Sequence, residues 1–213
     1  MMKFIKHYSL EIYTVISMTL IIVATLIGNL SFIQKMIVID AFLFILHEWE
    51  EGHYPGGFVD MVSNLIQRDV DAETKRASRL PAGIFLLILT VVPFIFSTTP
   101  MIIMALVTFG IIEGIVHTVG IRLFHRKRFY TPGMATAWLE FAVSVILILY
   151  LAVNHLGHWY DYAFGPLIMI AFFACLQKTM TLMVGINYAD MPKYVKAQWN
   201  RKYRPFDGYP SGK

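Results

Sequence analysis

The sequence predicts an all-α fold, a polytopic transmembrane helix bundle of about six spans with the N and C termini in the cytoplasm. Three observations predict it: the composition, the long apolar runs and the placement of lysine and arginine. Of 213 residues, 57% are hydrophobic and 15% are charged, whereas soluble domains are about 45–50% apolar and about 25% charged. Because the apolar excess lies in long runs, it is typical of helical membrane proteins.

Six apolar segments follow one another along the chain. A span needs about 20 residues, with a range of about 17–25. The second segment, with about 16 residues, is the shortest, and it could be a tilted short span or a re-entrant helix. The first is too long for a signal-peptide core and has no clear cleavage site, so we expect it to be retained. The segments are 8–32, 34–49, 81–98, 100–122, 135–156 and 163–186.

The basic residues predict the orientation of these spans. With six spans, 16 of the 18 lysines and arginines fall on one side of the membrane, and only Lys35 and Lys178 do not. A five-span arrangement would scatter them. Since cytoplasmic loops carry the excess of Lys and Arg, we expect both termini in the cytoplasm. We therefore expect a membrane domain over 1–186 and a basic cytoplasmic tail over 187–213, in a multi-pass protein of the bacterial plasma membrane.

The longest connection, 52–80, contains a short amphipathic piece, 58–66, which we expect to lie on the membrane surface. The net charge of +4 fits the positive-inside rule and attraction to anionic headgroups, and it is not a nucleic-acid signal. No Gly-rich phosphate loop or Ser-centred elbow is present in the sequence. The predicted partners are the lipid bilayer and a lipid or lipid-linked substrate, and the sequence does not identify protein partners.

Ionisable residues gather where the second segment ends, in the run His47-Glu48-Trp49-Glu50-Glu51. Such groups are costly in or beside a bilayer and mark a functional site. His47 and Glu51 lie one helical turn apart, and Glu113 and His117 repeat that spacing in the fourth segment. With six spans, His47, His117 and Glu113 lie roughly 3, 8 and 13 Å inside the cytoplasmic boundary. The two pairs can therefore meet in one leaflet.

Two imidazoles with two or three carboxylates suit zinc, iron or manganese. We expect His47, Glu51, Glu113 and His117 to bind a divalent metal, with zinc favoured over iron or manganese. The run reads both H-E-x-x-E and H-x-x-E-E, and it differs from two zinc-protease motifs by a glutamate at position 51. The general base is then Glu50 or Glu48, of which we favour Glu50. Alternatively, the run is a solvated helix end, and Glu–His hydrogen bonding between helices satisfies Glu113 and His117 without metal.

Other polar residues lie at similar depth. Asp40, two turns before His47 on the same face, could orient a ligand, relay protons or bond to a neighbouring helix. Glu140 and Lys178 are expected to form a buried ion pair. Thr131 is expected to cap the fifth helix.

These motifs resemble one known family. His47-x-x-Glu50-Glu51, then His117, then a Tyr-x-Pro-Gly-x-x-Thr block within residues 128–136, in this order, are similar to the HXXEE family of integral membrane proteins. The resemblance covers roughly residues 38–185. It implies a metal-binding or catalytic membrane protein and names no substrate.

The favoured function is a metal-dependent hydrolase that acts on a lipid or lipid-linked substrate at the cytoplasmic leaflet. One alternative is a non-enzymatic transporter or metal/proton carrier, with Asp40, Glu113, Glu140 and Lys178 along its path. Another is a glutamate-dependent intramembrane protease, whose E-E-x-x-x-R pattern would need Arg at the position of Pro55. If the protein binds no metal, a structural or partner-binding membrane protein is a further alternative.

Overall fold

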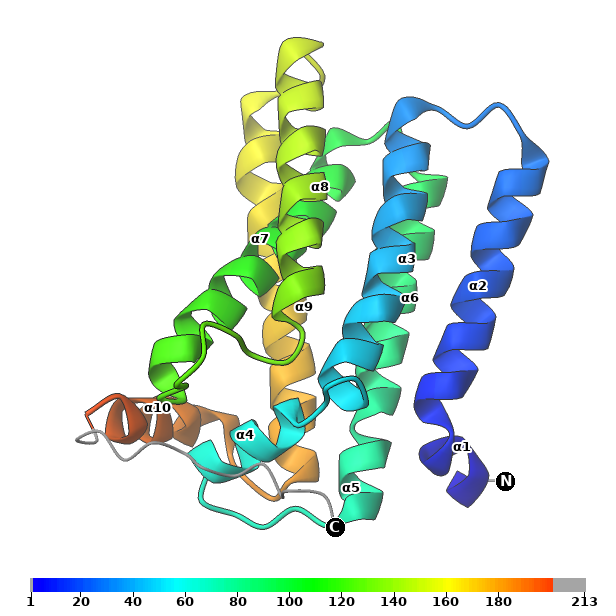
Figure 1. The fold of residues 1–213 in the computed structure, drawn as a ribbon. Coiled ribbons are helices and arrows are strands. Elements are labelled where there is room, and N and C mark those ends of the chain that lie inside the picture. The colour runs from blue at the N-terminus through cyan, green and yellow to red at the C-terminus, as the bar shows by residue number, and fades with distance from the viewer. Residues whose placement is uncertain (1, 201–213) are drawn as a thin grey trace.

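The six predicted segments form six long helices that run side by side (Figure 1). The computed structural model describes residues 2–200, and within them there is no strand. The helix ends differ from the predicted boundaries by no more than five residues. The helices are α2 (Ser9–Ile27), α3 (Phe32–Gly52), α6 (Arg79–Ile95), α7 (Pro100–Leu123), α8 (Met134–Val153) and α9 (Trp159–Met183).

Five stretches are long and apolar enough to cross a membrane, and they contain α2, α6, α7, α8 and α9. Helix α3 has 21 residues and extends from one end of the bundle to the other (Figure 1), so it is not a re-entrant helix. Its charged residues set it apart from an ordinary span, yet Asp40, Glu48 and Glu50 are buried inside the bundle. About six spans therefore fit the structure, and the chain is a multi-pass membrane protein.

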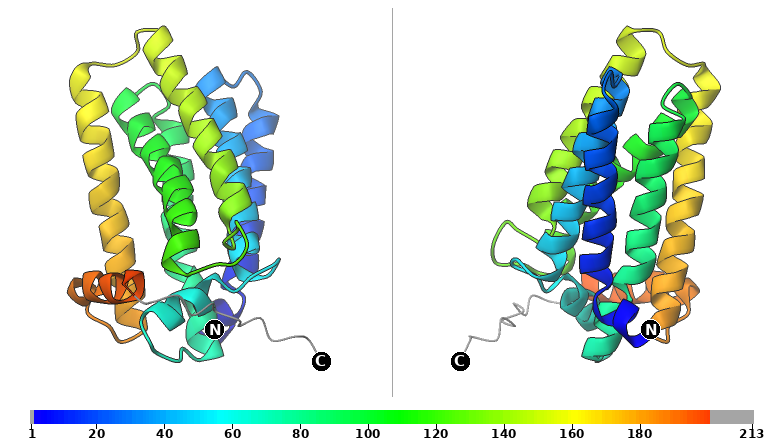
Figure 2. Two further views of the ribbon diagram at one scale, coloured as in Figure 1. Left: turned by 60° about the vertical axis from the view of Figure 1, so that its left-hand side comes forward. Right: turned by 90° about the vertical axis from the view of Figure 1, so that its right-hand side faces the viewer.

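Short helices gather at one end of the bundle, where α4 and α10 lie across the bundle axis (Figures 1 and 2). Helix α4 occupies the predicted amphipathic piece; it buries Met61 and Leu65 and exposes Asp60 and Asn64. Both α1 and α10 lie at this end, as an even number of spans requires. The short elements are α1 (Met2–His7), α4 (Phe58–Leu65), α5 (Ala72–Ala77), the 3-10 helix η1 (Tyr188–Asp190) and α10 (Met191–Trp199).

The orientation of the bundle in the membrane and the division of the chain into a domain and a tail remain predictions. The charge pattern places the α4 end of the bundle in the cytoplasm. The division into a membrane domain over 1–186 and a tail over 187–213 is also untested. Helix α10, inside the predicted tail, contacts α7 and α4. The rest of that tail, 201–213, lies outside the described residues.

Helix α7 is the centre of the bundle and packs against both α8 and α9. A Cβ on Gly165 of α9 would lie 2.6 Å from the carbonyl oxygen of Met101 in α7, so glycine allows the two helices to approach closely. An aromatic cluster joins α7 to α3 and α6. The ring centroid of Phe109 lies 5.6 Å from that of Phe44 and 5.1 Å from that of Phe85. This cluster lies one turn deeper than the predicted site and holds α3 against α7.

Two local predictions are wrong. Glu140 and Lys178 form no ion pair, because Glu140 is completely buried while Lys178 is exposed near the end of α9. A lysine in that position can extend its amine towards the headgroup region. Thr131 does not cap α8, because the cap position is taken by Gly133, and the Thr131 hydroxyl contacts His117 instead.

Candidate functional site

The predicted ligands meet at the α4 end of the bundle, between α3, α7 and the start of α8. Helix α3 contributes His47 and Glu51, and α7 contributes Glu113 and His117, each pair one turn apart. Both imidazoles are buried, with His47 5% and His117 1% exposed. Burial of this kind requires a partner for every polar atom.

Each of the two imidazoles approaches both carboxylates. Nε2 of His117 lies 3.3 Å from Oε1 of Glu51 and 3.4 Å from Oε2 of Glu113. Nε2 of His47 lies 3.6 and 3.8 Å from the same two oxygens. In a tetrahedral zinc site with bonds of about 2.0–2.1 Å, neighbouring ligand atoms are about 3.3–3.4 Å apart. The observed spacing therefore suits ligands around a common cation.

Nε2 of His117 is a buried atom without a hydrogen-bond partner. Its distances to the two carboxylates are short, but neither contact has hydrogen-bond geometry. Leaving such an atom unsatisfied costs about 1–3 kcal/mol. A cation would satisfy it. The ligand atoms of His47, Glu113 and His117 all lie within 4.8 Å of one another, and this group could hold a metal ion.

The other nitrogen of His47 is fixed by a threonine. Nδ1 lies 2.9 Å from Oγ1 of Thr136, and that hydroxyl lies 2.6 Å from Oε2 of Glu50 and 3.1 Å from the Gly133 carbonyl oxygen. Both of these oxygens are acceptors, so the hydroxyl hydrogen points to them and its lone pair faces Nδ1. Nδ1–H therefore donates to Thr136, so in the neutral imidazole the lone pair is on Nε2, on the side of Glu51 and Glu113.

His117 is held in the same way by a second threonine. The Thr131 hydroxyl donates to the backbone carbonyl of His117 at 3.0 Å, and Nδ1 of His117 lies 3.2 Å from the hydroxyl oxygen. Nδ1–H again donates, and in the neutral imidazole the lone pair is therefore on Nε2. Metal-binding histidines generally use one nitrogen for the ion and donate the other N–H to a fixed oxygen. Both imidazoles have this arrangement.

Glu50 joins α3 to the N-terminus of α8. Its Oε1 accepts hydrogen bonds from the Tyr130 hydroxyl at 2.6 Å and the Ala135 N–H at 3.1 Å. Its Oε2 accepts from the N–H and the hydroxyl of Thr136, at 2.9 and 2.6 Å. Helix α8 has no side-chain cap of its own, and a carboxylate is favourable at a helix N-terminus. Glu50 thus caps α8 and aims Thr136 at His47.

Gly133 lies directly against the site. Its φ of +90° favours glycine, and a Cβ there would lie 2.6 Å from Cε1 of His117, 2.8 Å from Cγ of Glu51 and 3.0 Å from Cε1 of His47. Any larger residue would displace the proposed ligands. The loop before α8 therefore covers the site closely because glycine is at this position.

Further carboxylates surround the site. Oε1 of Glu140 lies 3.8 Å from Nδ1 of His47, and neither oxygen of Glu140 has a hydrogen-bond partner. Asp40 is 2% exposed, and its Oδ1 is also unpartnered. Glu48 turns to the side of α3 that faces α6, where Nη1 of Arg79 donates to its carbonyl oxygen at 2.9 Å and lies 3.5 Å from its carboxylate. Around the site, the buried carboxyl groups are more numerous than the basic side chains that lie next to them.

A family described as "Protein of unknown function with HXXEE motif" matches residues 38–148 of the chain. The chain belongs to the HXXEE family. The matched region contains every residue of the site described above, from Asp40 to Glu140. No curated protein and no solved structure matches this HXXEE protein.

The HXXEE motif and the second histidine indicated the site, but the residues that orient it were missed. The four predicted ligands come together, while Glu50, predicted as the base, lies against α8. Sequence reasoning assigned no role to Thr136, interpreted Pro132-Gly133 only as the end of a loop and the start of the fifth helix, and gave Thr131 a different role. The Tyr-x-Pro-Gly-x-x-Thr block was the sequence signal from which these residues could have been identified. Its Tyr130 donates a hydrogen bond to Glu50, and its Thr136 contacts Nδ1 of His47.

Replacing Thr136 with valine is expected to weaken binding of a divalent metal. Valine keeps the shape but removes the acceptor for Nδ1–H of His47, and loss of such a partner typically lowers metal affinity about 10–100-fold. Titration of detergent-purified protein with Zn²⁺ against a chromophoric chelator measures the effect. Thr136→Ser, which keeps the hydroxyl, is the matched control. Equal affinities of the Val and Ser variants would contradict the orienting role.

Proposed function

We propose that this HXXEE protein is a membrane metalloenzyme, a metal-dependent hydrolase that acts on a lipid or lipid-linked substrate at the cytoplasmic leaflet. The observation that carries the proposal is the convergence of two oriented imidazole Nε2 atoms and two carboxylates at one end of the bundle. Their ligand-like spacing of 3.3–3.8 Å supports it. Zinc is favoured over iron or manganese, because histidines together with carboxylates are a common ligand set for zinc.

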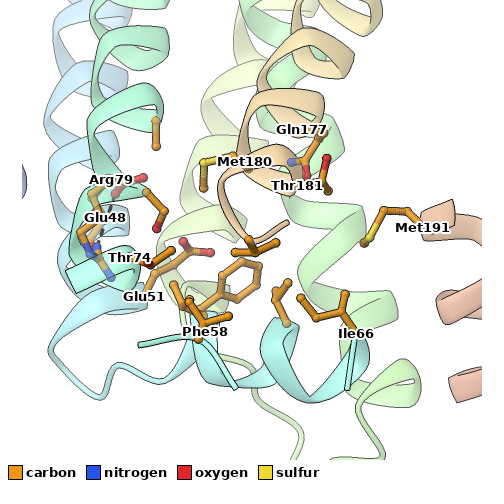
Figure 3. Close-up of a pocket in the computed structure, with 16 residues that line it drawn as sticks. Glu48, Glu51, Phe58, Ile66, Thr74, Arg79, Gln177, Met180, Thr181 and Met191 are labelled. Atoms are coloured by element: carbon orange, nitrogen blue, oxygen red, sulfur yellow. Dashed lines mark hydrogen bonds and ion pairs between the residues drawn. The ribbon is translucent and has the colours of Figure 1, made fainter. Parts of the chain in front are cut away.

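In this proposal His47, Glu113 and His117 hold the metal, and Glu51, the fourth predicted ligand, lies beside the position that water or substrate would take. Catalytic zinc sites use three protein ligands and keep one position for water or substrate. Of the four, Glu51 is the one that also lines a hollow beside the site (Figure 3). Substrate therefore approaches on the Glu51 side. The metal would supply Lewis acidity towards a carbonyl or phosphoryl group.

The general base needs a lone pair within reach of the proton that it removes. Glu50, the base favoured from the sequence, already accepts four hydrogen bonds, two on each oxygen. Glu48 lines the hollow together with Glu51. We therefore give Glu48 the role of base and Glu50 a positioning role through Thr136 and His47.

Because Glu48 and Glu50 have different roles in this proposal, replacing each with glutamine is expected to have a different effect. Glu48→Gln is expected to keep the metal and to lose about 10²–10⁴-fold in rate. Glu50→Gln is expected to lose metal affinity, because the cap on α8 and the orientation of Thr136 both change. Zinc-loaded full-length protein is incubated with mixed micelles of total membrane lipid, products are followed by mass spectrometry, and bound zinc is measured in parallel. Full activity of Glu48→Gln would remove it as the base, and no lipid turnover by the wild type would reject the hydrolase.

The carrier is a second candidate, favoured by one observation. The unpartnered carboxylates of Asp40 and Glu140 continue from His47 into the bundle, as sites along an ion path would. Lys178, expected on the same path, is exposed instead. Uptake of Zn²⁺ into sealed vesicles containing the wild type, lost in Glu140→Gln, would favour the carrier. Lipid turnover without uptake would favour the hydrolase.

A further inference from the structure

Beside Glu51, a hollow of about 130 Å³ opens between α4, α6, α9 and α10 (Figure 3). Most of its wall is apolar: Phe58 and Val62 come from α4, and Met180 and Val184 come from the end of α9 and the residue after it. An engineered apolar cavity of about 150 Å³ binds one benzene ring. By the same measure, this hollow has room for about six carbons of one hydrocarbon chain.

The charged side chains around this hollow are already paired with one another. Arg79 lies in its wall, donates a hydrogen bond to the Glu48 carbonyl oxygen at 2.9 Å and lies 3.5 Å from the Glu48 carboxylate. A second hollow, of about 270 Å³, shares Glu51 and Arg79 with the first. In its wall, Lys75 is paired with Asp60 at 2.6 Å. The two hollows meet at Glu51, the residue beside the proposed metal.

The charges at this junction favour an occupant with an uncharged head. Arg76, in the wall of the second hollow, is turned towards α1, and its Nη1 lies 2.7 and 3.1 Å from the two ring nitrogens of His7. An anionic head would have to displace a carboxylate from its partner and would lie beside Glu51, and a cationic head would lie beside Arg79. A charged group buried without a partner has a large desolvation cost. Among the described residues, the two walls therefore offer no excess charge that would compensate a charged head.

Uncharged hydrogen-bonding groups also line the first hollow (Figure 3). The hydroxyls of Thr74, Ser78 and Thr181 donate to oxygen atoms of the protein, at 2.7, 2.8 and 3.0 Å. Their oxygens keep lone pairs that can accept a hydrogen bond from an occupant. The amide of Gln177 offers both a donor and an acceptor. These groups suit the ester and hydroxyl groups of an uncharged lipid.

We propose that the first hollow binds one hydrocarbon chain of an uncharged lipid ester, with the chain against Phe58 and Val62 and the ester beside Glu51. That this lipid is the substrate rests on the proposed function, because Glu51 also faces His47 and His117. The binding itself does not rest on it, since it needs only the apolar wall and the paired charges. A monoacylglycerol, which has one chain, an ester and hydroxyl groups, has this chemistry.

The test is photolabelling of the full-length protein in phosphatidylcholine nanodiscs by a monoacylglycerol that carries a diazirine in its chain. Labelled peptides are identified by mass spectrometry. Saturable labelling is expected in the peptides that contain Phe58 and Met180, and 1-oleoylglycerol is expected to compete for it. 1-Oleoyl lysophosphatidic acid has the same chain and an anionic head. It is expected to compete at least about tenfold less well, because its charge has no partner in the hollow.

A substitution in the wall locates the bound chain. Val62→Trp places an indole in the first hollow and is expected to lower the saturable labelling at least about tenfold. Val119→Trp is the matched control, because Val119 is 45% exposed on α7 and lines neither hollow. The unfolding temperature of each variant is measured, so a misfolded protein is recognised and replaced by the milder Val62→Phe.

Competition by lysophosphatidic acid that equals that of 1-oleoylglycerol would overturn the uncharged head. Equal labelling of Val62→Trp and Val119→Trp would overturn the location. Bound zinc is measured in the same samples, so that the two proposals can fail separately. If the wild type is labelled saturably but contains no metal, the proposed enzyme fails and the lipid site stands. If it contains metal but shows no saturable labelling, the lipid site fails alone.

Discussion

The hydrogen bonds that Glu50 accepts from the start of α8 are the interaction on which the site depends. Inside or near a bilayer the first N–H groups of a helix must find acceptors within the protein. Glu50 supplies two of them from another helix, and its second oxygen also receives the Thr136 hydroxyl. The same carboxylate therefore joins α3 to α8. It also holds the Thr136 hydroxyl, which contacts the Gly133 carbonyl oxygen in the loop before α8. The same hydroxyl contacts Nδ1 of His47 and so determines which nitrogen of His47 faces the other ligands.

Charge in α3 has a cost that only the bundle interior can offset. An ionisable residue at the centre of a spanning helix costs about 2.5–3.5 kcal/mol on insertion scales. Asp40, Glu48 and Glu50 all avoid lipid by facing the neighbouring helices. Because these residues make α3 too polar to stand out as a span, the helix that carries the motif is also the helix that hydropathy identifies least well. Its full length follows from the packing and not from its composition.

The sequence predicted most of the helices and the ligands, because both follow from local periodicity. Apolar runs locate the spans, and the i,i+4 spacing places His47 with Glu51 and Glu113 with His117. What could not be predicted depends on how helices rotate against one another. Glu140 and Lys178 were expected to pair at equal depth, yet α8 turns Glu140 into the core while α9 turns Lys178 outwards.

The orienting residues were missed for a related reason. Thr131 and Thr136 are ordinary residues in sequence, and their role arises only when the loop before α8 folds onto α7 and α3. Gly133 likewise reads as a turn residue, but its contact with both imidazoles is tertiary. The structure shows the roles of these residues through contacts that no local sequence pattern contains.

The central claim is that His47 and His117 direct their Nε2 atoms at one divalent metal. Elemental mass spectrometry on protein purified in detergent without chelators, wild type beside the His47→Ala/His117→Ala variant, tests it most directly. The account predicts about one equivalent of metal per chain, with zinc favoured, in the wild type and none in the variant. Metal at background level in both proteins, or equal metal in the two, would contradict it.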